Sequence, residues 1–145
     1  MTATLLDIDA FKQLYQPFSE STLDRLHEFY AANIEFCDPI HRLVGLDELS
    51  RYFQGFSQAE SPTRFHFTDT LANDSQAFLC WEMHYSHPKL AKGKTLKLEG
   101  ASHIKFTEKI VFHQDYYDMN AMIYQHLPVI GAITQFVNHK IKSSS

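Results

Sequence analysis

The sequence predicts an α+β fold in which a strongly curved antiparallel sheet wraps around N-terminal helices. Two features of the chain lead to this prediction. Apolar residues recur at steps of three and four as far as Phe56, which is the helical period. From Thr63 onward apolar and polar residues alternate, which is the period of a strand with an inward and an outward face. Helices followed by a long sheet form an α+β plan, and the length suits a single domain over residues 1–145.

Four helices are expected. The first covers Ile8–Phe18 and ends near a proline. A capping-box pattern at Ser21–Asp24 predicts the start of the second helix, whose apolar face runs from Leu23 to Tyr30. Gly45 leads into a third helix that reaches Phe56, and an amphipathic pattern predicts an additional C-terminal helix over Leu127–Ile141.

The strands fall into a short pair and a long group. A strand at Ile34–Asp38 is stopped by a proline, and Arg42–Val44 is a second short strand. Polar turn signals between the later runs favour an antiparallel meander. The four long candidates are Arg64–Leu71, Gln76–Ser86, Thr95–Thr107 and Lys109–Asp118.

The inward face is clear in one strand and ambiguous in two. In Thr95–Thr107 the even-numbered residues are mostly apolar, so Ser102 should face inward and His103 outward. In Gln76–Ser86 the pattern alone would bury Trp81 and expose Glu82 and His84. The opposite assignment, with Glu82 and His84 facing inward, is supported equally well.

The closing strand, KIVFHQDYYD, is similarly ambiguous, with His113, Asp115 and Tyr117 on one of its faces. Strands that are apolar on both faces suggest that the outer face is covered as well, most simply by a second subunit, so a homodimer is predicted.

The composition of the chain indicates which classes of ligand it can bind. Aromatic residues make up 14% of the chain, which favours a pocket or interface lined by rings and a small apolar molecule as ligand. The net charge of −4 argues against nucleic acid. Cys37 and Cys80 have no metal-binding spacing and are interpreted as buried thiols in a reducing compartment. With no signal-peptide pattern and no long apolar run, the sequence predicts a cytoplasmic protein.

A metal site is not predicted. His84 and His87 lie an odd number of residues apart, so along a strand they would face opposite ways. Three convergent ligands are not evident from the spacing, and no cofactor is expected.

Several segments together resemble the nuclear transport factor 2-like superfamily, most closely its SnoaL-like and limonene-1,2-epoxide hydrolase group. These segments are FCDP at the end of the first strand, the helix after VG, the WEMHY strand and the closing KIVFHQDYYD. The resemblance implies a conical α+β barrel, a deep pocket between the concave sheet and the helices, and often a dimer.

The resemblance also implies roles for particular residues. Asp115 matches the first aspartate of the family's Arg-Asp-Tyr-Phe-Asp run and so takes the acid/base position. Phe36 and Asp38 stand where the epoxide hydrolases hold the attacking water. The family's Arg-x-Asp pair falls on Glu82-Met83-His84, so neither of its catalytic members is retained.

The predicted site combines these residues with the face assignments. Asp115 is the expected base, with His84, Glu82 or Asp38 as acid or water holder. Trp81 is expected to pack outside the pocket, and Asp118 to cap the helical segment that begins at Met119. The predicted substrate-binding residues are Phe36, His41, Ser102, His113 and Tyr117.

Three functional hypotheses remain open at this stage. The first is an acid/base enzyme of isomerase, cyclase, dehydratase or hydrolase type that acts on an apolar substrate. The second is a pocket that binds a hydrophobic ligand without turning it over. The third is contact with a membrane or a partner through the C-terminal helix, where His139, Lys140 and Lys142 stand beside apolar residues.

Overall fold

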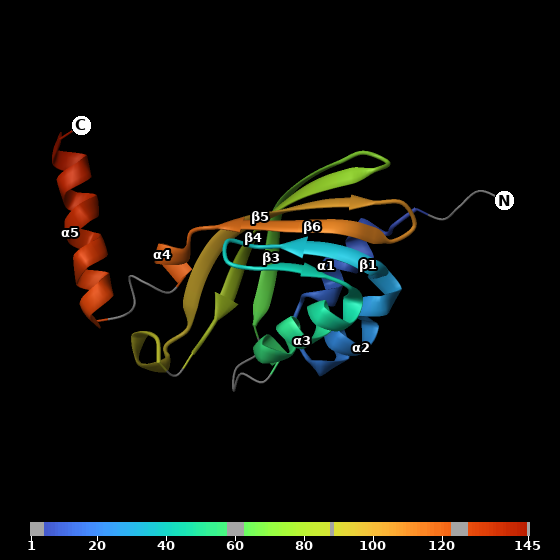
Figure 1. Cartoon of the computed structure of the whole chain (residues 1–145), viewed down its shortest axis with the longest axis horizontal. Coiled ribbons are helices and arrows are strands. Elements are labelled where there is room, and N and C mark those ends of the chain that lie inside the picture. Colours follow the sequence, from blue (N-terminus) through green and yellow to red (C-terminus); the bar gives the residue numbers. More distant parts are fainter. Residues whose placement is uncertain (1–4, 58–62, 88, 123–127, 145) are drawn as a thin grey trace.

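Three helices and a bent sheet enclose the core of the domain. The computed structural model describes residues 5–57, 63–87, 89–122 and 128–144. The N-terminal helices lie together against one face of the sheet (Figure 1). They are α1 (Ile8–Leu14), α2 (Glu20–Phe29) and α3 (Leu46–Ser57).

The sheet contains six strands in the order β2-β1-β6-β5-β4-β3. They are β1 (Tyr30–Cys37), β2 (Arg42–Val44), β3 (Arg64–Ala72), β4 (Gln76–Tyr85), β5 (Leu96–Phe106) and β6 (Ile110–Tyr117). The predicted α+β fold is confirmed, with one correction: β1 and β6 pair in parallel, so the open sheet is mixed rather than wholly antiparallel. These two strands are far apart in the sequence, so no hairpin forces them to run in opposite directions.

The core lies between the helices and the inward face of the sheet. Its fully buried side chains come from both layers, so that burial of apolar surface holds the helices on the sheet. The largest of them include Phe11, Leu26, Ile34, Leu49, Leu79, Ile104 and Ile110.

Two element boundaries differ from the sequence prediction. Helix α2 begins at Glu20, where the N–H of Ser19 donates to Oγ1 of Thr22 at 3.0 Å, so the capping pattern assigned to Ser21–Asp24 was placed two residues too late. Strand β1 begins at Tyr30, which the helical pattern had included in the preceding helix. The Tyr30 hydroxyl is held in a buried hydrogen bond, and this tertiary contact outweighs the local pattern.

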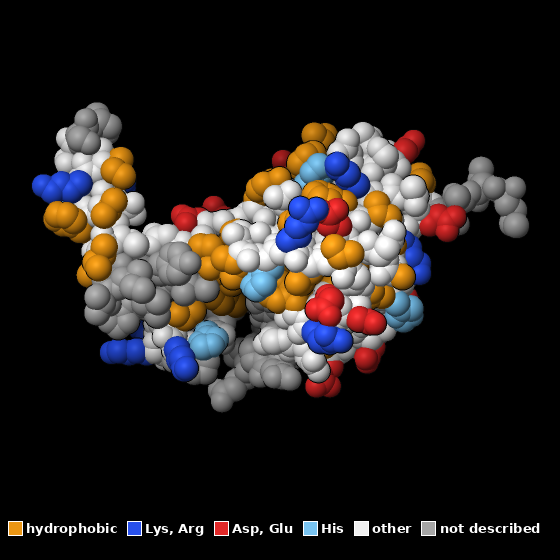
Figure 2. Space-filling view, in the orientation of Figure 1, with side chains coloured by type: hydrophobic (Ala, Val, Ile, Leu, Met, Phe, Trp, Pro, Cys, Tyr) orange, Lys and Arg blue, Asp and Glu red, His pale blue; other side chains and the backbone are white. Residues whose placement is uncertain are grey.

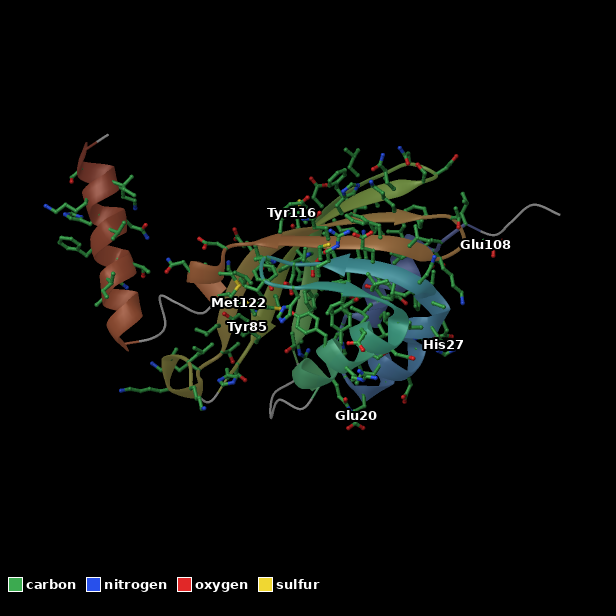
Figure 3. All side chains as sticks on the ribbon, viewed as in Figure 1. Glu20, His27, Tyr85, Glu108, Tyr116 and Met122 are labelled. Atoms are coloured by element: carbon green, nitrogen blue, oxygen red, sulfur yellow. The ribbon has the colours of Figure 1, made fainter. Side chains whose placement is uncertain are left out.

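Two short elements complete the body of the domain: the 3-10 helix η1 (Ala91–Gly93) and the single-turn helix α4 (Met119–Met122). Oδ1 of Asp118 accepts the N–H of Asn120 at 2.8 Å, which confirms the predicted cap. Tyr85 and Met122 lie side by side, and the Tyr85 hydroxyl donates to the Met122 carbonyl oxygen at 2.5 Å (Figure 3).

The C-terminal helix α5 (Pro128–Ser144) stands apart from the rest of the domain (Figure 1). Its exposed hydrophobic side chains are visible in Figure 2 and include Ile133, Phe136, Val137 and Ile141. Within the described part of the chain, no helix combines the length and the apolar character needed to cross a membrane.

Candidate active site

A cavity opens between the concave side of the sheet and the helices. The space inside it is about 640 Å³, counting the open mouth. Helices α1, α3 and α4 and every strand except β2 contribute to its wall. The lining residues are Phe11, Tyr15, Phe18, Phe36, Asp38, Tyr52, Phe53, Phe65, Phe67, Trp81, Met83, Ser102, His113, Asp115, Tyr117 and Met122.

Trp81 lies in the wall of this cavity, so the prediction that it packs outside is wrong. Its cross-strand partner is Gly100, and directly opposed residues of an antiparallel pair point to the same face. The even-numbered face of β5 is the inner one, as predicted, with Ser102 buried. A Cβ at Gly100 would lie 2.4 Å from Cη2 of Trp81, so the missing side chain is what makes room for the indole.

Glu82 and His84 point to the outer face of the sheet. The prediction that they act as acid or water holder beside Asp115 is therefore wrong. They pair with Glu99 and Lys97 of β5, which face outward, and their side chains are 29% and 42% exposed. Oε1 of Glu82 lies 3.7 Å from Nζ of Lys97. Side chains alternate along a strand, so the family match at Glu82-Met83-His84 put the wrong face inward; Trp81 and Met83 are the inward pair.

A β-bulge places the functional side chains of β6. The register shifts so that Lys105 pairs with Phe112 while Phe106 pairs with Ile110, leaving Val111 as the extra residue. Ile110 and His113 therefore both point inward, although they are three residues apart. Beyond the bulge the alternation is regular.

The ambiguity of the closing strand is thereby resolved. His113, Asp115 and Tyr117 all line the cavity.

One carboxylate oxygen of Asp115 has two hydrogen-bond partners. The Ser102 hydroxyl donates to Oδ1 at 2.5 Å, and Nε2 of His113 lies 2.7 Å from Oδ1. Within the described residues Oδ2 of Asp115 receives no hydrogen bond, and the side chain is 17% exposed. The carboxylate is therefore held in place by one oxygen while the other remains available to a ligand.

A chain of buried groups supports this arrangement from behind. Nδ1 of His113 lies 2.8 Å from the Tyr30 hydroxyl, which in turn lies 2.5 Å from the Tyr15 hydroxyl. Burial raises the pKa of both phenols, so each keeps its proton and can donate. If Nε2 of His113 donates to the carboxylate, its Nδ1 is left to accept from Tyr30.

The other side of Asp115 is supported in a similar way. Nε1 of Trp81 donates to Oγ of Ser102 at 2.9 Å, and an indole N–H can only donate. The Ser102 hydroxyl proton is then directed to Asp115. Both branches of the network therefore end on Oδ1 of the carboxylate.

Asp38 is a second carboxylate in the cavity wall, and its side chain is 2% exposed. Its Oδ1 accepts the backbone N–H of Ile40 at 3.0 Å and of His41 at 2.7 Å, as an aspartate that closes a turn does. Its Oδ2 accepts a short hydrogen bond from the Tyr52 hydroxyl and lies 3.5 Å from the Tyr117 hydroxyl. Asp38 therefore both closes the turn that follows β1 and lines the cavity.

The remaining predicted ligand-binding residues divide between the cavity and its surroundings. Phe36 is buried in the wall beside His113, with ring centroids 5.0 Å apart. His41 does not line the cavity: its ring packs on Tyr52, and its Nδ1 lies 3.3 Å from Oδ1 of Asp38 without hydrogen-bond geometry. Among the residues that the structure describes, no group of three His, Cys, Asp or Glu side chains is placed to hold a metal ion.

Burial raises the pKa of four tyrosines around the site, and we expect this to be visible at alkaline pH. For Tyr117 the charges of Asp38 and Asp115 add to the effect, and for Tyr52 its hydrogen bond to Asp38 does so. Absorbance titration of the folded protein should show these four phenols protonated above about pH 10, the usual value.

The same tyrosines should make stability depend on pH. Above about pH 10 an unfolded tyrosine binds fewer protons than the native one, so the free energy of unfolding should fall as the pH rises through that range. Denaturation at stepped alkaline pH measures this. Ionisation of all seven tyrosines near the usual value, with the protein still folded, would contradict the placement of the four.

With the geometry established, comparison with known proteins identifies the family. The family model described as a SnoaL-like domain matches residues 11–113. The chain belongs to the SnoaL-like family. The match ends two residues before Asp115, so the family assignment rests on the fold-forming part of the chain. No curated protein matches the chain.

Solved structures share the fold at low sequence identity. An NTF2-like protein of unknown function from Burkholderia pseudomallei is 14% identical, with a TM-score of 0.68 over 80% of this chain and 93% of its own. A hypothetical protein with a ketosteroid isomerase-like fold from Catenulispora acidiphila, in complex with trimethylamine, is 15% identical, with a TM-score of 0.68 over 83% and 92%. A candidate polyketide cyclase from Acidithiobacillus ferrooxidans is 16% identical, with a TM-score of 0.64 over 82% and 90%. At these identities the likeness establishes the NTF2-like fold of the chain.

Proposed function

We propose that this protein is an acid/base enzyme that removes a proton from a carbon in the apolar part of a small-molecule substrate, with Asp115 as the general base. The observation that carries the proposal is the one-sided support of Asp115, whose Oδ1 is held by Ser102 and His113 while Oδ2 is left for the substrate. A positioned carboxylate in a largely apolar cavity suits proton transfer.

The proposed step is balanced within the site. A C–H bond next to a substrate carbonyl breaks, an O–H bond forms at Oδ2 of Asp115, and the electron pair moves into the carbonyl. The Tyr117 hydroxyl also lines the cavity, and burial keeps it protonated, so it can donate a hydrogen bond to a substrate oxygen. Return of the proton to another carbon gives isomerisation, while attack by the carbanion gives cyclisation.

The residues of the cavity wall support epoxide hydrolysis less well than they support proton transfer. The epoxide hydrolases use two carboxylates bridged by a guanidinium, and among the described residues that line this cavity none is an arginine. Glu82 and His84, which occupy the matching sequence positions, face away from the cavity. The proposal is therefore limited to proton transfer.

Deuterium exchange tests the proposal without knowledge of the natural substrate. β-Tetralone, a planar apolar ketone with acidic C–H groups, is incubated with the protein in deuterium oxide and followed by NMR. We expect exchange above the buffer rate in the wild type and equally in Glu82→Gln and His84→Asn, which alter only the outer face. Exchange at the buffer rate would favour the alternative function, a binding module whose ring-lined wall holds an apolar molecule unchanged.

We also propose that the outer face of the sheet pairs with a second copy of the chain. Exposed apolar side chains on this face support the proposal, among them Phe78 and Tyr116. The Phe78 ring stacks on His103 with centroids 4.1 Å apart, so two rings lie together on this face. Sedimentation should give a dimer that Tyr116→Arg weakens; a monomer at high concentration would contradict it.

A further inference from the structure

The charged side chains in the cavity wall have one sign. Asp38 and Asp115 are both carboxylates, and among the described residues that line the cavity there is no lysine or arginine. Placing two carboxylates in a largely apolar space is costly unless cations or hydrogen bonds compensate. Here hydroxyl and N–H groups supply the hydrogen bonds, with His113 and His41 as the ionisable neighbours.

The rest of the wall has the chemistry that attracts organic cations. Ten of the sixteen lining residues are Phe, Tyr or Trp. The faces of such rings carry partial negative charge and attract ammonium groups, more strongly when water is excluded. A wall of rings with carboxylates therefore discriminates by charge as well as by shape, since an anionic ligand would meet two charges of its own sign.

We infer that the substrate of this site is an organic cation: a protonated or alkylated amine attached to a planar apolar body. This inference rests on the proposed function, because it concerns the same cavity and names the class of molecule that Asp115 acts on. The amine lies beside Asp38 and the rings, and the acidic carbon lies at Oδ2 of Asp115.

Asp38 suits the amine because its carboxylate is already oriented. Its Oδ1 is fixed by the N–H groups of Ile40 and His41, and its Oδ2 faces the hydroxyls of Tyr52 and Tyr117. Both phenols stay protonated because of burial and add no charge, and Tyr52 holds the carboxylate as a donor. The two carboxylates can then serve different parts of one molecule.

A pair of probes with the same shape tests this inference. meta-Hydroxyphenyltrimethylammonium and meta-tert-butylphenol differ in having a charged nitrogen or a neutral carbon at the same position. We expect the cation to bind the wild-type protein about 10-fold more tightly, as measured by titration calorimetry or ligand-observed NMR. Asp38→Asn and Asp115→Asn should each remove most of that preference while retaining the affinity for the neutral probe.

Glu82→Gln is the matched control, since it removes one carboxylate outside the cavity with the same change in net charge. It should keep the preference for the cation. Three results would overturn the inference. They are equal binding of the two probes, no binding of the cation at millimolar concentration, and an unchanged preference for the cation when Asp38→Asn and Asp115→Asn are combined. Exchange of β-tetralone that depends on Asp115, without a preference for the cation, would overturn the inference alone and leave the proposed function standing.

Discussion

Asp115→Asn is expected to slow the deuterium exchange of bound β-tetralone by about 100- to 10,000-fold, the usual contribution of a general base. Asparagine keeps the shape of the side chain and can still accept from Ser102 and His113 through its amide oxygen. It lacks a basic oxygen to take the proton. The loss should therefore fall on the exchange rate, with little change in the affinity for the ketone.

Two variants on the same strand test whether the position of the carboxylate determines the exchange rate. Gln114→Glu adds a carboxylate next to Asp115 in sequence but on the outer face, and it should not restore exchange to Asp115→Asn. Asp115→Glu keeps a carboxylate but moves it by one methylene group, so it should retain part of the rate. Wild-type exchange in a folded Asp115→Asn variant would show that another group removes the proton.

Gly100→Ala is expected to lower the free energy of unfolding by about 1–3 kcal/mol, as overpacking of a buried site does. The new Cβ would lie 2.4 Å from Cη2 and 2.7 Å from Cζ2 of Trp81, a buried and rigid ring that cannot simply turn aside. Displacement of the ring would also break the hydrogen bond from Trp81 to Ser102, and with it one branch of support for Asp115. Chemical denaturation followed by the fluorescence of the single tryptophan measures both the stability and the ring environment.

Gly55→Ala is the control for this substitution. Gly55 lies within α3, and a Cβ there would meet nothing within 4 Å, so alanine should raise helix stability by up to about 1 kcal/mol. A double variant of Gly100→Ala with Trp81→Phe should recover part of the loss, because the smaller ring removes the clash. Equal and small effects at Gly55 and Gly100 would mean that Trp81 does not lie over Gly100.

The fold was largely predictable because its signals are local. The change from the helical to the strand period indicated the layers, and the alternation in β5 identified the inner face with Ser102. The parallel pairing of β1 with β6 could not be predicted this way, because it joins strands that are distant in the sequence. The bulge at Val111 is likewise a tertiary feature, and it sets which β6 side chains face inward.

The site was predictable only in part. Asp115, His113, Tyr117 and Asp38 were named from the sequence, and the structure brings them to one cavity. Glu82 and His84 were assigned through a family match that put the outward face of their strand inward, although the periodicity of that strand offered the correct face. Gly100 opposite Trp81 was a further signal, since a glycine within a strand often marks the close approach of another group.

The supporting tyrosines were not identified as site residues. Tyr15 and Tyr52 lay in apolar helical stripes, and Tyr30 at the end of one, so the pattern indicated only that they were buried. Their hydroxyl partners come from elements far away in the sequence, as with Tyr30 and His113, which are 83 residues apart. Spacing along a helix carries no information about such contacts.

A crystal structure of the protein with β-tetralone bound tests the central claim most directly. We predict that the ketone lies in the cavity among the rings, with an acidic carbon about 3–3.5 Å from Oδ2 of Asp115, the separation at which proton transfer becomes possible. Its oxygen should face the Tyr117 hydroxyl. A ketone bound with both acidic carbons away from Asp115, or with Oδ2 of Asp115 turned out of the cavity, would contradict the assignment of Asp115 as the base.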